Sequence, residues 1–204
     1  MKRPWLSVAV FCAVFSGIIL FCIIFGGYSS LYRAQNRINA AKGLVTVECQ
    51  KRLDLIPELV TMAGKVELSA PISQNKLAGI NRTAKDTQTI LTLINKESPL
   101  GKEVITVFEQ SQVRLTQEIT GLILELKKDE NFGSSPAFIS LEKKFENLEI
   151  SVFFNSHKYN KEARYFNTRK TIFPGLIIAK LFGLEEIHFP EITAGLFTPE
   201  KRKS

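Results

Sequence analysis

Residues 5–27 form an apolar run, roughly 23 residues long, in which the only ionisable side chains are the thiols of Cys12 and Cys22. A helix of that length can cross about 30 Å of hydrocarbon. The run is too long for the apolar core of a cleavable signal peptide, and Gly27-Tyr28-Ser29 is a poor cleavage site. The sequence therefore predicts a retained transmembrane anchor at residues 5–27, preceded by a short flank at residues 1–4.

The flanking residues agree with this span but leave its orientation open. Trp5 lies at one end and Tyr28 at the other, where aromatic rings favour the two membrane interfaces. Basic residues flank both ends, so the positive-inside rule discriminates weakly. We expect a bacterial inner-membrane protein with Lys2 and Arg3 inside and the remaining chain on the periplasmic or outer side. The opposite orientation stays open.

The net charge of +7 would suit nucleic acid or an anionic lipid surface. The apolar run favours lipid contact. The basic tail Glu200-Lys201-Arg202-Lys203 is short and carries no interleaved aromatic residues for base stacking, so no nucleic-acid partner is predicted. Membrane lipids bound through residues 5–27 are the partner that the composition supports.

After residue 28 the apolar residues recur at steps of three and four, which is typical of amphipathic helices. Four such segments share residues 28–172, and short breaks separate them. The segments can bury their apolar faces by packing antiparallel around one core. The predicted fold is all-α: an N-terminal transmembrane helix followed by an elongated antiparallel bundle of about four long helices.

The breaks between these helices are marked by proline, glycine and polar residues. Pro71 opens the second helix, which ends near Ser98-Pro99. The polar stretch 127–135 is predicted to be a loop. Ser135-Pro136 is predicted to cap the fourth helix, which runs to about Ile172.

Within the first bundle helix, residues 52–60 read Arg-Leu-Asp-Leu-Ile-Pro-Glu-Leu-Val. Pro57 removes one backbone hydrogen bond and presses on the carbonyl of Leu53, at a cost of about 3 kcal/mol, so a kink or an interruption is expected there. A bend that wraps the helix around its neighbours is the first interpretation. A recognition notch exposing the Leu53 carbonyl is the second.

This nonapeptide resembles the Leu-Ile-Pro motif of the LemA family, which comprises membrane-anchored bacterial helical proteins. Downstream, Tyr159-Asn160, Phe166-Asn167 and Phe173-Pro174 fall at the spacing of the family's Tyr-Asn repeat and terminal Phe-Pro. The resemblance covers the anchor, residues 36–66 and residues 136–189. It implies that envelope proteins such as membrane proteases are conceivable partners.

The chain also departs from the family pattern. Lys42 replaces the usual tryptophan, Lys51 an arginine, Leu53 a tyrosine and Glu58 an asparagine, while the family's Thr-Glu-Asn-Arg group is retained only as Glu149. A binding role that requires the complete polar group is therefore in doubt for this chain.

A polar line runs along the predicted fourth helix beside its apolar face. At 100° per residue, five positions fall within about 20° of Glu149. They are Glu142, Glu149, Ser156, Asn160 and Asn167. The line would either face a single partner, or form interhelical hydrogen bonds and a solvated flank.

Residues 173–204 follow the bundle as a short C-terminal helix and a tail. Pro174 falls in the first turn of that helix, Gly175 to Phe182 are mostly apolar, and Gly183 is its expected cap. The helix is too short to span a membrane. We expect it either to dock against the bundle or to lie on the bilayer surface.

The residue content offers little to a catalyst. Two histidines and three cysteines show no metal-ligand spacing, and no phosphate loop or nucleophile elbow occurs, so no cofactor or metal is predicted. The expected function is a non-enzymatic scaffold or adaptor of the cell envelope. Candidate partner-binding or structural residues are Asp54, Pro57, Glu149, Tyr159, Asn160, Asn167 and Pro174.

Two alternatives belong to other classes of protein. One is a membrane-bound enzyme acting on a lipid or cell-wall fragment, with Asp54 or Glu58 as acid or base near Pro57. A deep pocket there would support it, and a flat helix surface would oppose it. The other is a structural envelope protein that forms homo-oligomers through an exposed helical face.

Overall fold

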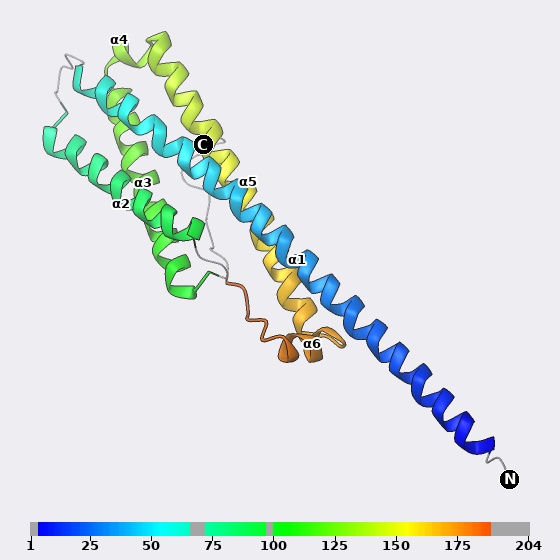
Figure 1. Cartoon of the computed structure of the whole chain (residues 1–204). Coiled ribbons are helices and arrows are strands. Elements are labelled where there is room, and N and C mark those ends of the chain that lie inside the picture. Colours follow the sequence, from blue (N-terminus) through cyan, green and yellow to red (C-terminus); the bar gives the residue numbers. More distant parts are fainter. Residues whose placement is uncertain (1–3, 66–71, 97–99, 189–204) are drawn as a thin grey trace.

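The computed structural model describes residues 4–65, 72–96 and 100–188, which form helices without any strand (Figure 1). Four helices are long and two are short. They are α1 (Pro4–Lys65), α2 (Gln74–Lys96), α3 (Lys102–Leu126), α4 (Glu130–Gly133), α5 (Pro136–Thr171) and α6 (Gly175–Leu181). The predicted all-α class is confirmed. Pro71 and Ser98-Pro99, predicted to bound the second helix, lie outside the described residues.

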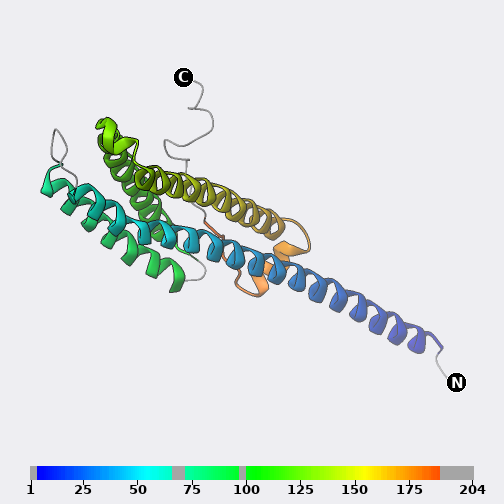
Figure 2. The same cartoon turned by 90° about the horizontal axis from the view of Figure 1, so that it is seen from above.

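Helix α1 joins the apolar run and the first bundle segment in one helix of 62 residues. At 1.5 Å per residue it is about 90 Å long. Near its N-terminus an 18-residue window has a mean hydropathy of 2.9, and none of that window is buried. This part of α1 extends beyond the bundle in every view (Figures 1 and 2). One helix is thus long and apolar enough to cross a membrane.

Pro57 does not interrupt α1, which continues helically to Lys65. Of the expected kink or interruption, the interruption does not occur. The pyrrolidine ring lies on the exposed side of the helix, whereas Ile56 and Leu59 are buried on the other side. Packing of the apolar residues on both sides of Pro57 holds the helical path, so tertiary contacts outweigh the local cost of the proline.

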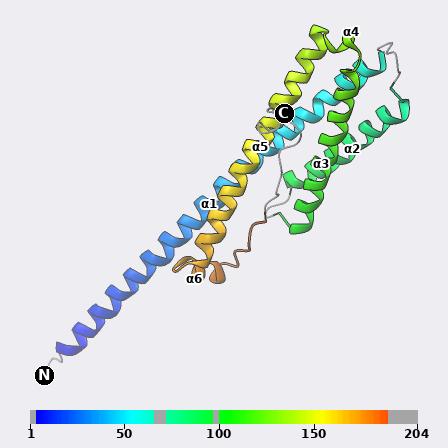
Figure 3. The same ribbon diagram turned by 180° about the vertical axis from the view of Figure 1, so that it is seen from behind.

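The C-terminal half of α1 packs along α5 and α2, and α2 packs along α3. From behind, α2 and α3 cover the half of α1 that is farther from the N-terminus (Figure 3). Most residues of the predicted rows form the core; the exceptions Val60, Ala84, Val104, Ser111 and Leu148 are half-buried. Core residues at the predicted positions include Ile38, Val45, Ile56, Ile80, Leu91, Phe108, Leu115, Leu122, Phe138, Phe145 and Phe166.

The start of α5 agrees with the sequence prediction. The Ser135 hydroxyl accepts a hydrogen bond from the Phe138 amide at 3.3 Å, and Pro136 occupies the first turn, where its missing N–H is not needed. The preceding stretch 127–135 contains the short helix α4, although a loop was predicted there. The reason is a second cap, because Asp129 accepts from the Phe132 amide at 3.0 Å.

Helix α6 is docked against both α5 and α1. It ends as predicted: Gly183 has a φ of 61°, and the amide of Leu184 donates to the carbonyl of Ala179 at 2.9 Å. The left-handed backbone at Gly183 turns the chain so that the last carbonyls of the helix are used, which is the conformation that glycine adopts most readily. Residues 184–188 then return along α5.

Candidate functional site

A polar cluster lies inside the bundle at the level of Arg52, whose side chain is only 1% exposed. One guanidinium nitrogen of Arg52, Nη1, donates to the Thr116 hydroxyl at 2.9 Å and also to the Glu149 carboxylate. The other, Nη2, donates to the Gln112 side-chain oxygen. We call Arg52, Gln112, Thr116 and Glu149 the central cluster. It connects α1, α3 and α5.

Within the central cluster the two charges neutralise each other. The Glu149 side chain is 11% exposed and pairs with Arg52, and the Thr116 hydroxyl donates to Glu149 Oε1 at 3.3 Å. The cluster is not fully satisfied: among the described residues, Arg52 Nε and Gln112 Nε2 have no hydrogen-bond partner. A guanidinium this deeply buried needs its carboxylate partner, because an isolated charge in such a place is strongly unfavourable.

Cys49 lies one turn before Arg52 on α1 and is buried. Burial raises the pKa of its thiol to about 11; the positive charge of Arg52 lowers this pKa, and the negative charges of Glu149 and Glu48 raise it. The thiol is therefore protonated at neutral pH. Since the thiolate is the reactive form, Cys49 is suited to packing and poorly suited to nucleophilic chemistry.

The structure directs most of the predicted polar line on α5 toward other parts of the chain. Glu142 forms an ion pair with Lys127, Glu149 pairs with Arg52, and the side-chain nitrogen of Asn167 donates to the Ile187 carbonyl at 2.8 Å. Ser156 is buried and Asn160 is half-buried. Along this line the polar atoms of α5 thus meet α1, α3 and the segment after α6.

Tyr159 and Asn167 hold the segment that follows α6. The Tyr159 hydroxyl donates to the His188 carbonyl at 3.1 Å, and burial raises the pKa of Tyr159 to about 12. The Asn167 amide bonds both backbone groups of the buried residue Ile187, since its oxygen also accepts from the Ile187 amide at 3.0 Å. The Tyr159-Asn160 and Phe166-Asn167 motifs thereby supply contacts that hold residues 187–188 on α5.

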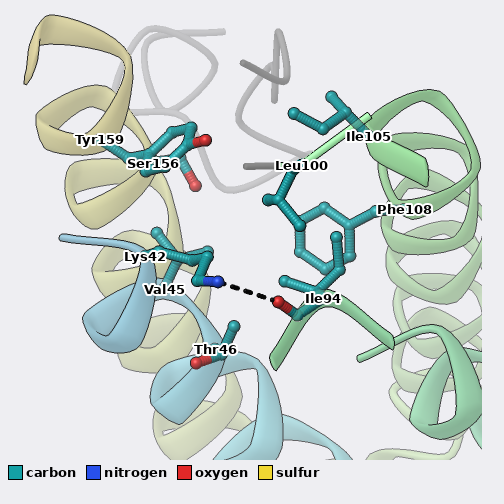
Figure 4. A pocket seen from close by; sticks show the side chains of 9 residues that line it. All are labelled: Lys42, Val45, Thr46, Ile94, Leu100, Ile105, Phe108, Ser156 and Tyr159. Atoms are coloured by element: carbon teal, nitrogen blue, oxygen red, sulfur yellow. Dashed lines mark hydrogen bonds between the residues drawn. The ribbon is translucent and has the colours of Figure 1, made fainter. Parts of the chain in front are cut away.

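A small cavity lies between α1, α5, the end of α2 and the start of α3 (Figure 4). Lys42 points across it and donates to the Ile94 carbonyl at 3.2 Å, while Ser156 and Tyr159 approach from α5. The volume is about 20 Å³, which is room for one water molecule. A substrate does not fit there.

The other residues predicted for a site are on the surface. Asp54, Pro57 and Glu58 are exposed, and Asp54 accepts a hydrogen bond from the neighbouring Gln50 side chain at 2.9 Å. Pro174 lies instead at the start of α6, after a cis peptide bond with Phe173. The structure therefore does not bring Asp54 and Pro57 together with Glu149. Within the described residues, no group of three or more His, Cys, Asp or Glu is placed to hold a metal ion.

A comparison with protein-family models matches residues 41–198 to the LemA family. The chain belongs to the LemA family. The match begins after the apolar part of α1 and includes α2 and α3, which lie between the ranges 36–66 and 136–189 that carry the sequence resemblance. No curated protein and no solved structure matches the chain.

Sequence reasoning on this LemA-family chain missed Arg52, Gln112 and Thr116 as site residues. The signal was present in their positions. Arg52 follows buried Cys49 by three residues and precedes buried Ile56 by four, so a charge occupies the apolar row of α1. Gln112 and Glu149 interrupt the apolar rows of α3 and α5 in the same way. Two opposite charges in buried rows of one bundle predict an internal ion pair.

Proposed function

We propose that this LemA-family protein is a non-enzymatic, single-pass membrane protein of the bacterial cell envelope. Residues 5–27 anchor it in the inner membrane, with Lys2 and Arg3 inside the cell and the bundle on the periplasmic side. The helical rod serves as a scaffold or adaptor for other envelope proteins, such as membrane proteases. Helical bundles present long, rigid outer faces, which suits this role.

The inward orientation of Cys49, Arg52 and Glu149 is the observation that carries the proposal. The charges of Arg52 and Glu149 neutralise each other inside the bundle, and Cys49 is buried as a thiol. By contrast, Asp54 and Glu58 lie on the exposed side of α1, where no enclosing apolar wall prepares a carboxylate for acid or base work. The motif therefore supports the framework, and the outer faces remain for partners.

An exposed aromatic cluster on α5 offers a defined position at which to test the proposal. Phe154 is 65% exposed, and the ring centroid of its neighbour Phe153 is 5.7 Å away. The His157 ring lies tilted against Phe153, with centroids 4.2 Å apart. Aromatic side chains contribute a large share of binding energy at protein interfaces. Lys158 is exposed one turn after Phe154, so a photoreactive residue placed there would sample this surface.

The test is photo-crosslinking of the full chain in intact cells, from position 158. A scaffold is expected to yield a discrete adduct with another envelope protein, which Phe154→Ala removes. Leu124→Ala on α3 is the matched control, because Leu124 is similarly exposed at 55% and should leave the adduct unchanged. The variants Asp54→Asn and Glu58→Gln should also leave it unchanged.

Two outcomes would overturn the scaffold role. An adduct with the mass of two copies of this chain would favour self-association. If Leu124→Ala removed the adduct as fully as Phe154→Ala does, the surface around Phe154 would not be the partner-binding surface. The orientation has a separate measurement. A reporter that is active only outside the cytoplasm, fused after Ser204, should be active; inactivity would place the bundle inside.

A further inference from the structure

The end of the bundle nearest the apolar half of α1 exposes large apolar side chains. Helix α6 buries Ile178 and Ala179 against its neighbours, yet its other apolar residues and those of the preceding turn face outward. Phe173 is 69% exposed and Leu181 is 64% exposed. We call this surface the foot; its residues are Ile172, Phe173, Leu176, Ile177, Leu181 and Phe182.

The foot lies beside the point where the apolar run of α1 ends. Ile178 packs so closely on Gly27 that its Cδ1 atom is 2.2 Å from where a Cβ of residue 27 would be. The rings of Phe182 and Tyr28 have centroids 4.6 Å apart. Figures 1 and 3 both show α6 against α1 at this level. Gly27 is therefore both the last residue of the apolar run and the docking point of α6.

This position sets the depth of the foot in a bilayer. From Trp5 to Gly27 a helix rises about 35 Å, against about 30 Å of hydrocarbon. Gly27 and Tyr28 then fall at the hydrocarbon boundary, and α6 is fixed at the same depth. The apolar surface of the foot is continuous with the exposed apolar surface of α1, so one apolar medium can cover both.

Basic side chains lie just before and among the residues of the foot. Arg169 and Lys170 are in the last turn of α5, and Lys180 is in the last turn of α6. Arg169 lines a groove of about 360 Å³ between residues 26–31 of α1 and the turn from α5 to α6. Glu185 and Glu186 follow in the segment that leads back to the bundle. Cations beside an apolar surface at this depth match the phosphate groups of anionic lipids.

We propose that the foot is a second lipid-binding element, which lies in the headgroup region of a bilayer containing anionic phospholipid. This inference rests on the proposed anchoring through residues 5–27 and adds a contact that the anchor does not supply. With the anchor it forms two attachments to one surface and fixes the direction in which the rod leaves the membrane. The depth of α6 favours lipid over a protein partner.

Fluorescence quenching in vesicles tests the proposal on the full chain. Trp5 is the only tryptophan, so Trp5→Phe provides a silent background. Into it, Ile177→Trp, Val14→Trp and Leu124→Trp place a single probe in the foot, in the anchor and on α3; these positions are similarly exposed at 54%, 57% and 55%. The vesicles contain phosphatidylcholine and phosphatidylglycerol, with bromine on the acyl chains as the quencher.

The expected result is strong loss of emission from positions 177 and 14 and none from position 124. Quenching at 14 without quenching at 177 would overturn the foot and leave the anchor standing. No quenching at 14 would overturn the anchoring and the foot together.

A second arm uses bromine on one lipid class at a time. Stronger quenching of position 177 by brominated phosphatidylglycerol is expected, and Lys170→Gln with Lys180→Gln should remove that preference; equal quenching in the parent would overturn the anionic selectivity.

Discussion

The central cluster buries polar side chains, whereas the foot exposes apolar ones. At the central cluster two charged and two uncharged polar side chains lie inside the bundle, where apolar residues are usual. At the foot six large apolar side chains lie outside, where polar residues are usual. Both regions lie along α1: Arg52 of the central cluster is on this helix, and α6 in the foot packs on it at Gly27.

The comparison shows that the buried charges and the exposed apolar side chains are accommodated in different ways. The buried charges are tolerated because they face each other across helices that are far apart in the sequence, Arg52 and Glu149 being 97 residues apart. The exposed apolar groups of the foot are only partly covered by the described residues, as where Phe182 meets Tyr28. They lie instead at the end of an exposed apolar helix, where a medium of the same polarity would cover them. Substitutions in the central cluster should therefore have different effects from substitutions at the foot.

The largest effect is expected at the central cluster. Glu149→Leu removes the negative charge and leaves Arg52 buried without its partner, which should lower the free energy of unfolding by about 3–5 kcal/mol. Urea unfolding of the full chain in detergent micelles measures this. Replacing both residues, Arg52→Met with Glu149→Leu, should recover most of the loss, because two apolar side chains of similar volume suit the site.

The exposed pair of Arg37 and Glu162 is the matched control for this experiment. These side chains are 53% and 22% exposed, so Glu162→Leu should cost at most about 1 kcal/mol. Equal losses in Glu149→Leu and Glu162→Leu would contradict the distinct role of the central cluster. A double variant that is no more stable than Glu149→Leu would show that the polar contacts themselves, and not charge burial, dominate the stability.

At the foot, Gly175→Ala should have the next largest effect. A Cβ at this position would lie 2.1 Å from the carbonyl oxygen of Arg169, a backbone atom that cannot rotate away. The free energy that keeps α6 docked on α5 should fall by about 1–3 kcal/mol. Hydrogen exchange at the Phe182 and Leu184 amides, which bond to α6 carbonyls, should speed up while the amides of α3 keep their protection.

Gly43→Ala is the control for that substitution. A Cβ at Gly43 would meet nothing within 4 Å, so alanine should stabilise α1 by about 0.5–1 kcal/mol through its better helix propensity. If Gly175→Ala left the exchange at Phe182 and Leu184 unchanged, α6 would not be held by the close approach to α5, and the foot would lack a rigid support.

The smallest effect concerns pH and Cys49, which lies one turn before Arg52 on α1. The pKa of Cys49 is about 11 in the folded chain against an ordinary value of about 9, so the folded state binds the proton more tightly than the unfolded state. The contribution of the Cys49 thiol to the free energy of unfolding is therefore fully present below pH 9 and falls as the pH rises toward 11. At pH 10 the loss is about 1 kcal/mol. Urea unfolding at pH 8 and pH 10 should show this loss in the parent chain.

Cys49→Ala should shift stability at both pH values and abolish most of the difference between them. Tyr159, whose pKa is raised to about 12, is present in both chains, so its contribution cancels. The same pH dependence in both chains would show that Cys49 is not the group that titrates. No comparable effect is expected from changes at the foot, which holds no thiol.

Much of the fold followed from sequence because its signals are local. The spacing of apolar residues predicted four long helices, and Ser135-Pro136 and Gly183 predicted two helix ends that the structure confirms. The short helix α4 was missed because one Asp129 cap within a polar stretch gives little signal. Of the kink or interruption expected at Pro57, the interruption does not occur, because local propensity does not include the packing of Ile56 and Leu59.

The sequence by itself determined that this chain contains a helix able to span a bilayer and a set of amphipathic helices, since apolar period and run length are properties of neighbouring residues. Only the tertiary structure decided where the polar motif residues point. Arg52 selects Gln112, Thr116 and Glu149 from two other helices, and α6 comes to lie at Gly27, because such contacts depend on how distant helices pack. That packing places Arg52 and its partners inside the bundle, where they join three helices. It also places α6 at the proposed membrane surface.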